Sequence, residues 1–412
     1  MKRPLRGLMP ACLMATWLTA CTSPPTTPEP RLAPVAVAPP ASPALPPPLL
    51  RYDDAVLSAA TALLKNAQLE QSTTHALVID PLIDGMTGQQ SVTTRSMGER
   101  VATLVRQQYP QYAVQPFSPA TIARSPLVLI GTFTGVNAQR QTSGTREAYR
   151  LCFALADLKT GKLVSKGLAF SLPEGIDATP LPSFRDAPAW TEDPATLGYI
   201  RTCQGTKAGD PINPMYLDRI VAAAQVAEAI EAYDAGKYRQ ALDLYTSVQR
   251  TAAGDQFRVY NGLYLANLKL GRRAEADAAF GQIVAYGLAH RRLAVKFLFR
   301  PGSTAFDSGS TLTAAYPGWL KTIASSAQGG SACLEVTGHT SPTGPEVLNQ
   351  RLSLLRAEFV KSRLEASVPT LAKRVIANGV GSSQTLIGTG RDDASDALDR
   401  RVEFAVIECG KA

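Results

Sequence analysis

From about Leu293 to its end, the chain alternates short apolar runs with longer amphipathic stretches, and this alternation constrains its fold more than any other feature. Short apolar runs predict strands, whereas apolar residues at intervals of three and four predict helices. Strands are expected at 295–299, 334–337, 374–379 and 401–407, and helices at 312–326 and 349–363. The segment 293–412 is therefore predicted to be an α+β domain with the order βαβαββ.

Three motif blocks lie inside this segment. Gly338-His339-Thr340 ends the second strand, Asn349, Leu352 and Arg356 recur along the second helix, and Arg400-Arg401-Val402-Glu403 begins the last strand. In this order and spacing the blocks resemble the OmpA-like peptidoglycan-binding domain. That resemblance implies a binding domain for the diaminopimelate of the peptidoglycan stem peptide.

The residue types suit such a ligand. Asn349 and Arg356 are seven residues apart, two helical turns, and so share one helix face. The strand end at Thr340 is expected to offer free N–H groups to a carboxylate, and the Arg356 guanidinium to grip the same carboxylate with two nitrogens. Carried over by position, the expected binding residues are Thr340, Ser341, Thr343, Asn349, Leu352, Arg356 and Arg401.

One position departs from the family pattern. After Gly-His-Thr the family usually has Asp, which pairs with the ligand's ammonium group, whereas this chain has Ser341. A neutral hydrogen bond near 1 kcal/mol in place of a charged one of about 1.5–3 kcal/mol predicts binding weaker by about tenfold or more. Asp399 or Glu346 is a candidate for the missing charge; the alternatives are a different stem peptide and a fold kept as a scaffold. For Arg356, the alternative is a surface ion pair with Glu358 or Asp399.

The N-terminus carries a targeting pattern. A basic start is followed by an apolar run at 8–18, too short to span a bilayer, and then by Leu18-Thr19-Ala20-Cys21. The last four residues resemble the bacterial lipobox. The resemblance implies that residues 1–20 are removed as a signal peptide, that Cys21 is acylated and that Thr22 directs sorting to the outer membrane. The alternative is an ordinary secretory signal.

A proline-rich linker is expected at 21–50. Eleven of the 30 prolines of the chain lie in this stretch, which has almost no charge. Such a composition cannot form a packed core, so the segment is expected to act as a spacer between the lipid surface and the folded domains.

Two further segments separate the linker from the C-terminal domain. Residues 51–213 interleave helical and strand patterns and predict an α/β domain, with a long surface loop at 171–213, which is rich in Pro, Asp and Gly. Residues 214–292 contain two similar stretches, 236–245 and 271–280, related by a shift of 35. The shift resembles the tetratricopeptide repeat and predicts a short helical pair, which would be either a rigid connector, the interpretation favoured here, or a peptide-binding groove.

The cysteines fit an exported protein. Of the six, one would leave with the signal peptide and Cys21 would be acylated, so four remain. An oxidising compartment predicts two disulfides, and three pairings are conceivable. Cys152–Cys203 and Cys333–Cys409 are favoured because each pair then stays within one predicted domain; the alternative is four free thiols.

Composition argues against several functions. A net charge of +8 over 412 residues is too small to indicate a nucleic-acid partner, and three histidines leave little room for a histidine-rich metal site. No nucleophile and base are spaced around His339, and the acidic stretch 392–396 is expected to be a solvated loop rather than a metal site. We therefore expect neither catalytic residues nor a metal or other cofactor.

The sequence as a whole predicts a non-enzymatic, lipid-anchored protein of the outer membrane that faces the periplasm and tethers the membrane to peptidoglycan. The alternative is a regulatory or assembly lipoprotein for a cell-wall synthase or an envelope secretion machine. In that case the first domain and the helical pair would contact an envelope protein, and the C-terminal domain would only localise the chain. The first domain loosely resembles lipoproteins of these systems through Asp80, Arg95 and the turn at 157–161.

Overall fold

A computed structural model describes residues 47–69, 74–190, 193–309, 312–330, 333–392 and 395–409. The chain divides into two units, Met1–Pro46 and Pro47–Ala412, and the described residues all belong to the second. The expected signal peptide, acylated cysteine and most of the linker lie outside the described residues. Within those described, no helix is long and apolar enough to cross a membrane.

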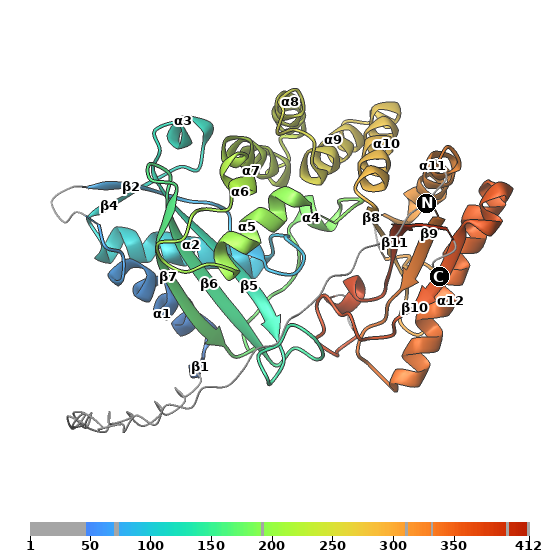
Figure 1. The fold of residues 1–412 in the computed structure, drawn as a ribbon, viewed down its shortest axis with the longest axis horizontal. Helices are drawn as coiled ribbons and strands as arrows, with labels where there is room; N and C mark the ends of the chain where they lie inside the picture. Colours follow the sequence, from blue (N-terminus) through green and yellow to red (C-terminus); the bar gives the residue numbers. More distant parts are fainter. Residues whose placement is uncertain are drawn as a thin grey trace, which may run out of the picture. The chain divides into compact units, whose positions relative to one another are not determined.

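A seven-stranded sheet organises the first half of the described chain (Figure 1). Its strand order is β1-β7-β6-β5-β2-β4, with β3 paired to β5. The long strands β5, β6 and β7 are antiparallel neighbours, whereas β2 pairs in parallel with β4 and β5. The bounds are β1 (Leu49–Leu50), β2 (His75–Ile79), β3 (Ile83–Asp84), β4 (Tyr112–Gln115), β5 (Leu127–Val136), β6 (Ala148–Asp157) and β7 (Lys162–Ser171). Since β1 pairs with β7, the end of the expected linker belongs to this sheet.

Helices cover both faces of this sheet, which explains why its central strands are apolar throughout rather than alternating. Leu151 and Phe153 of β6 pack in the same core as α1 and α2, whereas Cys152 and Ala154 pack with α5 on the opposite face. The helices of this half are α1 (Tyr52–Lys65), α2 (Val92–Gln108), α3 (Pro119–Ile122), α4 (Pro182–Arg185), α5 (Pro194–Gln204) and α6 (Pro214–Leu217). Tyr199 and Cys203 of α5 are buried in the core on that opposite face, and Phe184 of α4 is buried in a separate hydrophobic cluster. The surface loop expected at 171–213 is therefore wrong.

Four helices follow, in the segment where a repeated pair is expected: α7 (Ile220–Asp234), α8 (Tyr238–Gln249), α9 (Phe257–Lys269) and α10 (Arg273–Ala289). Gly236 and Gly271 have φ of 76° and 74°, a left-handed backbone that glycine adopts without steric cost. Gly236 lies just before α8, and Gly271 lies just before α10. Tyr245 and Phe280, which end the two similar stretches, are both buried in one hydrophobic cluster.

The second sheet has four strands in the order β10-β9-β11-β8. Its strands and the helices between them are β8 (Arg292–Leu298), α11 (Tyr316–Gln328), β9 (Cys333–Gly338), α12 (Glu346–Ser367), β10 (Val375–Gly379) and β11 (Arg401–Ile407). Short 3-10 helices lie at Thr313–Ala315, Pro369–Lys373 and Ser395–Leu398. The mixed α+β character of the chain is thus confirmed. One hydrophobic cluster joins this sheet to the four helices before it, with Phe280 of α10 stacked on Trp319 of α11.

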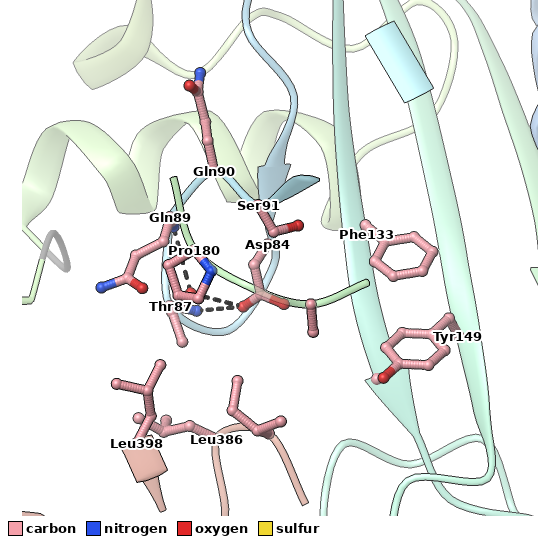
Figure 2. Close-up of a pocket in the computed structure, with 13 residues that line it drawn as sticks. Asp84, Thr87, Gln89, Gln90, Ser91, Phe133, Tyr149, Pro180, Leu386 and Leu398 are labelled. Carbon is pink, nitrogen blue, oxygen red and sulfur yellow. Dashed lines mark hydrogen bonds between the residues drawn. The ribbon is translucent and has the colours of Figure 1, made fainter. Parts of the chain in front are cut away.

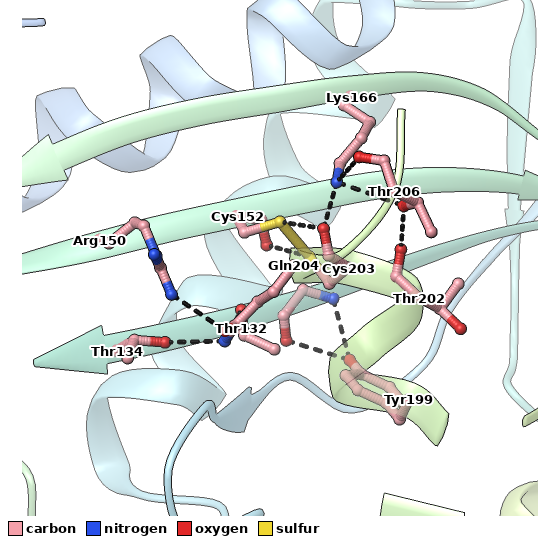
Figure 3. Close-up of a disulfide and its surroundings, with 11 residues drawn as sticks. Thr132, Thr134, Arg150, Cys152, Lys166, Tyr199, Thr202, Cys203, Gln204 and Thr206 are labelled. Carbon is pink, nitrogen blue, oxygen red and sulfur yellow. Dashed lines mark hydrogen bonds between the residues drawn. A yellow bond between two sulfur atoms is a disulfide. The ribbon is translucent and has the colours of Figure 1, made fainter. Parts of the chain in front are cut away.

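Two disulfides are present, with the pairing that the sequence favours. Cys152–Cys203 joins β6 to α5, and Cys333–Cys409 joins the start of β9 to the residues after β11. Figure 3 shows the first bond with the Lys166 ammonium group beside it, which donates hydrogen bonds to the carbonyls of Cys203 and Thr206. Cross-links that close loops of this size typically stabilise a fold by about 2–4 kcal/mol.

The loop before β11 also contacts the first sheet. Arg146, just before β6, donates from its backbone N–H to the carbonyl of Gly388 (3.0 Å) and from Nη2 to the carbonyl of Thr385 (2.9 Å). A cavity of about 30 Å³ lies beside these contacts, and the stacked rings of Phe133 and Tyr149 line it together with Leu386 (Figure 2). This volume accommodates one or two water molecules and is too small for an organic ligand.

The close packing of α8 on α9 can be tested by a substitution at Gly262 of α9. A Cβ atom there would lie 2.1 Å from the Tyr245 ring, whereas one at Gly281 of α10 would meet nothing within 4 Å. We expect Gly262→Ala to lower the free energy of unfolding by about 1–3 kcal/mol through overpacking. The matched control Gly281→Ala should raise it by up to about 1 kcal/mol. Urea denaturation measures both; equal effects of the two substitutions would contradict this packing.

Candidate functional site

Helix α12 carries three of the seven expected binding residues, and two glycines let it lie directly against the strands. A Cβ at Gly338 would be 1.8 Å from the carbonyl oxygen of Ser353, and one at Gly379 would be 2.4 Å from the backbone nitrogen of Leu354. On the inward face of the helix, Asn349, Ser353 and Arg356 are buried. The close approach brings this polar face to the end of β9.

Arg356 is fully buried, and three backbone carbonyls accept its hydrogen bonds. Nε donates to Ser303 (3.0 Å), Nη1 to His339 (2.9 Å) and Nη2 to Arg300 (2.9 Å). Burial, reinforced by the nearby Arg400 guanidinium, lowers the pKa of Arg356 to about 10, so this side chain stays charged at neutral pH. The surface ion pair considered as an alternative for Arg356 does not form.

A cavity of about 370 Å³ opens beside these residues. Six of the seven expected binding residues line it: Thr340, Ser341, Thr343, Asn349, Leu352 and Arg356. Arg356 contributes to its floor with no exposed surface, so the expected grip by two of its nitrogens on a ligand carboxylate does not fit this conformation. Asn349 Nδ2 donates to the carbonyl of Thr343 (3.2 Å) and thereby holds the β9–α12 loop at the mouth.

Arg401 is the expected binding residue that does not line this cavity. Its Nε donates to Glu403 (2.7 Å), and the preceding residue, Arg400, lines the cavity instead. Arg401 begins β11, whereas Arg400 lies just before it, and the two side chains contact different carboxylates, Glu403 and Asp392. Burial opposes ionisation of Glu403, but the Arg401 guanidinium group outweighs it and lowers the pKa of Glu403 to about 2.

Asp392 also lines the cavity, although the sequence predicts a solvated loop there. Its Oδ1 accepts hydrogen bonds from Ser341 Oγ (2.7 Å) and from Arg400 Nη1 (2.8 Å). No local pattern could have indicated this contact, because Ser341 is 51 residues away in the sequence.

The two residues expected to supply the missing charge have other contacts. Asp399 is buried and accepts backbone N–H groups from Leu386, Ile387 and Gly388. Glu346 accepts hydrogen bonds from Ser382 and Gln350. Neither carboxylate lines the cavity, so neither compensation hypothesis agrees with the structure.

His339 has no role in proton transfer that the geometry supports. Burial lowers its pKa to about 3, so the imidazole is neutral at pH 7, and neither ring nitrogen has a hydrogen-bond partner in the described part of the chain. No group of three or more His, Cys, Asp or Glu side chains among the described residues is placed to hold a metal ion.

Comparison with curated proteins shows similarity over a short stretch. No family model matches the chain. The outer membrane protein Omp38 of Acinetobacter baumannii, from two strains, is 40% identical over 77 residues, which is 19% of this chain and 21% of Omp38. The chain therefore spans about a fifth of the length of the curated relatives that it matches. This similarity confirms the resemblance to OmpA-like proteins that the motifs indicate.

Solved structures with partial similarity include three from envelope systems. The peptidoglycan-associated lipoprotein of Burkholderia pseudomallei is 22% identical and covers 27% of this chain and 88% of its own, with a TM-score of 0.24. The cell wall anchor of the T6SS of Pseudomonas aeruginosa is 24% identical and covers 31% and 96%, with a TM-score of 0.23. The periplasmic domain of MotB from Helicobacter pylori is 18% identical and covers 27% and 68%, with a TM-score of 0.22. Values this low carry no conclusion about function.

The contacts of Arg356 predict a large structural effect of its removal. We expect Arg356→Ala to lower the free energy of unfolding by about 3 kcal/mol or more, because three partly buried carbonyls lose their donor. Arg351 provides the matched control, since it lies on the same helix, lines the same cavity and is exposed. Arg351→Ala should change stability by less than about 0.5 kcal/mol. Chemical denaturation of both variants decides; equal stabilities would contradict the anchoring role.

Proposed function

We propose that this protein is an outer-membrane lipoprotein that faces the periplasm and tethers the outer membrane to the cell wall, by binding peptidoglycan non-covalently through residues 293–412. One observation carries the proposal: the cavity beside α12, which gathers six of the seven residues expected from the OmpA-like motifs. The similarity to an outer membrane protein over 77 residues supports the same compartment.

The chemistry of the cavity suits the end of a peptide stem. Its volume of about 370 Å³ lies within the range of small-molecule sites, and its walls combine cationic Arg356 and Arg400 with anionic Asp392. Groups of both signs in one cavity match a zwitterionic amino-acid end such as that of diaminopimelate.

The membrane end of the tether would be the acylated Cys21. Each CH₂ group of an acyl chain contributes about 0.8 kcal/mol of binding free energy when it is buried in the bilayer. A cysteine that carries several acyl chains would therefore anchor the protein stably. The proline-rich residues after it would act as a spacer, with a polyproline rise of about 3.1 Å per residue. These residues precede the described unit, and their role rests on the sequence.

Blocking the cavity should weaken the binding of the protein to peptidoglycan. Thr343 lines the mouth and is exposed, whereas Val347, four residues later, is exposed but does not line it. We expect Thr343→Trp to weaken co-sedimentation of the full-length, detergent-solubilised chain with insoluble peptidoglycan by about tenfold or more, equivalent to at least 1.4 kcal/mol. The control Val347→Trp should sediment like the unmodified chain.

If the unmodified chain failed to sediment with peptidoglycan, the tether would be ruled out. Crosslinking of the first sheet or of α7–α10 to an envelope protein would then favour the alternative, a regulatory or assembly lipoprotein. Equal loss of binding in both tryptophan variants would place the wall contact outside this cavity.

Replacing the expected acylation site tests the membrane end of the proposed tether. We expect Cys21→Ser to remove labelling by radioactive palmitate and to deplete the protein from the outer-membrane fraction. Cys12→Ser, within the expected signal peptide, is the matched control and should leave both unchanged. Palmitate labelling that persists in Cys21→Ser would contradict the expected acylation site.

A further inference from the structure

Among the described residues that line the cavity beside α12, Asp392 is the one acidic residue. One of its two carboxylate oxygens accepts no hydrogen bond from the described residues. Both hydrogen bonds to Asp392, from Ser341 and from Arg400, end on Oδ1. Oδ2 accepts no hydrogen bond from the described residues, and the side chain is 23% exposed. A hydrogen-bond acceptor with a full negative charge is therefore available to a ligand.

The loop before β11 holds Asp392 in this position. The residue has a φ of 56°, in the left-handed region that non-glycine residues seldom adopt. Asp396, which is fully buried, accepts the backbone N–H groups of Arg391 and Asp392, each at 3.0 Å. The buried carboxylate of Asp396 thus fixes the backbone at Asp392.

The surrounding charges determine what Oδ2 can bind. Arg400 pairs with Oδ1, and the Arg356 guanidinium in the floor of the cavity adds a second positive charge. An anionic group alone would meet the cations but be repelled by Asp392. A ligand that carries an ammonium group beside a carboxylate matches both signs, and the ammonium group would donate to Oδ2 in a charge-assisted hydrogen bond.

We propose that Asp392 is the specificity residue of this site and binds the free ammonium group of a stem-peptide amino acid. The inference rests on the proposed function, peptidoglycan binding in this cavity. Asp392 thereby supplies, from the loop before β11, the carboxylate that Ser341 does not provide after Gly-His-Thr. Stems whose side-chain amine is blocked are poor ligands.

The first experiment removes the charge and keeps the shape. Full-length, detergent-solubilised chain is sedimented with insoluble peptidoglycan that contains diaminopimelate. We expect Asp392→Asn to weaken binding by tenfold or more, with a thermal unfolding midpoint close to that of the unmodified chain. Glu358→Gln is the matched control, because it removes one negative charge from an exposed position on α12 outside the cavity.

The second experiment blocks the ligand instead. Treating the peptidoglycan with acetic anhydride acetylates its free amines and removes their charge. Binding of the unmodified chain should fall by tenfold or more, whereas the weaker binding of Asp392→Asn should change by less than threefold, because the partner of the ammonium group is already gone. Adding Ser341→Asp to Asp392→Asn should restore both affinity and sensitivity to acetylation.

The outcomes separate this inference from the function on which it rests. If Thr343→Trp abolishes sedimentation but Asp392→Asn binds like the unmodified chain, wall binding stands and the role of Asp392 is overturned. Undiminished binding of the unmodified chain to acetylated peptidoglycan overturns that role without any variant. A chain that never sediments with untreated peptidoglycan overturns both proposals.

Discussion

The C-terminal site depends on three hydrogen bonds that the Arg356 guanidinium group donates to backbone carbonyls. These bonds connect α12 to the end of β9, at His339, and to the segment after β8, at Arg300 and Ser303. Burying a guanidinium is costly unless its donors are satisfied, and here carbonyl dipoles satisfy them without neutralising the charge. One side chain therefore fixes the walls of the cavity and leaves a positive charge beneath it.

Acidic residues shape the opposite wall from inside the protein. Asp396 and Asp399 are both fully buried, and each accepts several backbone N–H groups of the loop between β10 and β11. For Asp399, burial raises the pKa and the N–H donors oppose that rise. Carboxylates used in this way act as internal templates for an irregular loop, and their number in the sequence says little about surface charge.

Local patterns predicted much of the fold, and long-range contacts account for what was missed. The central strands and α12 follow from apolar runs and helical periodicity, and the disulfides follow from keeping each pair within one domain. Helix α5 was missed because Asp193 and Pro194, a side-chain cap and a first-turn proline, are also typical of loops. The family motif predicts Arg401 in the cavity, whereas Arg400, the residue just before β11, lines it, because the motif alone does not tell which of two adjacent arginines faces inward. The position of Asp392 depends on a loop whose path no periodicity describes.

Arg146, just before β6 of the first sheet, contacts the loop before β11 and so links that sheet to the cavity beside α12. Its bonds to Thr385 and Gly388 hold the proximal part of the same loop whose distal part carries Asp392. A truncated protein that begins at β8 would lose this clamp although every cavity residue remained. The loop that carries Asp392 would then lack two of the hydrogen bonds that hold it, so the shape of the cavity depends on the first sheet as well as on α12.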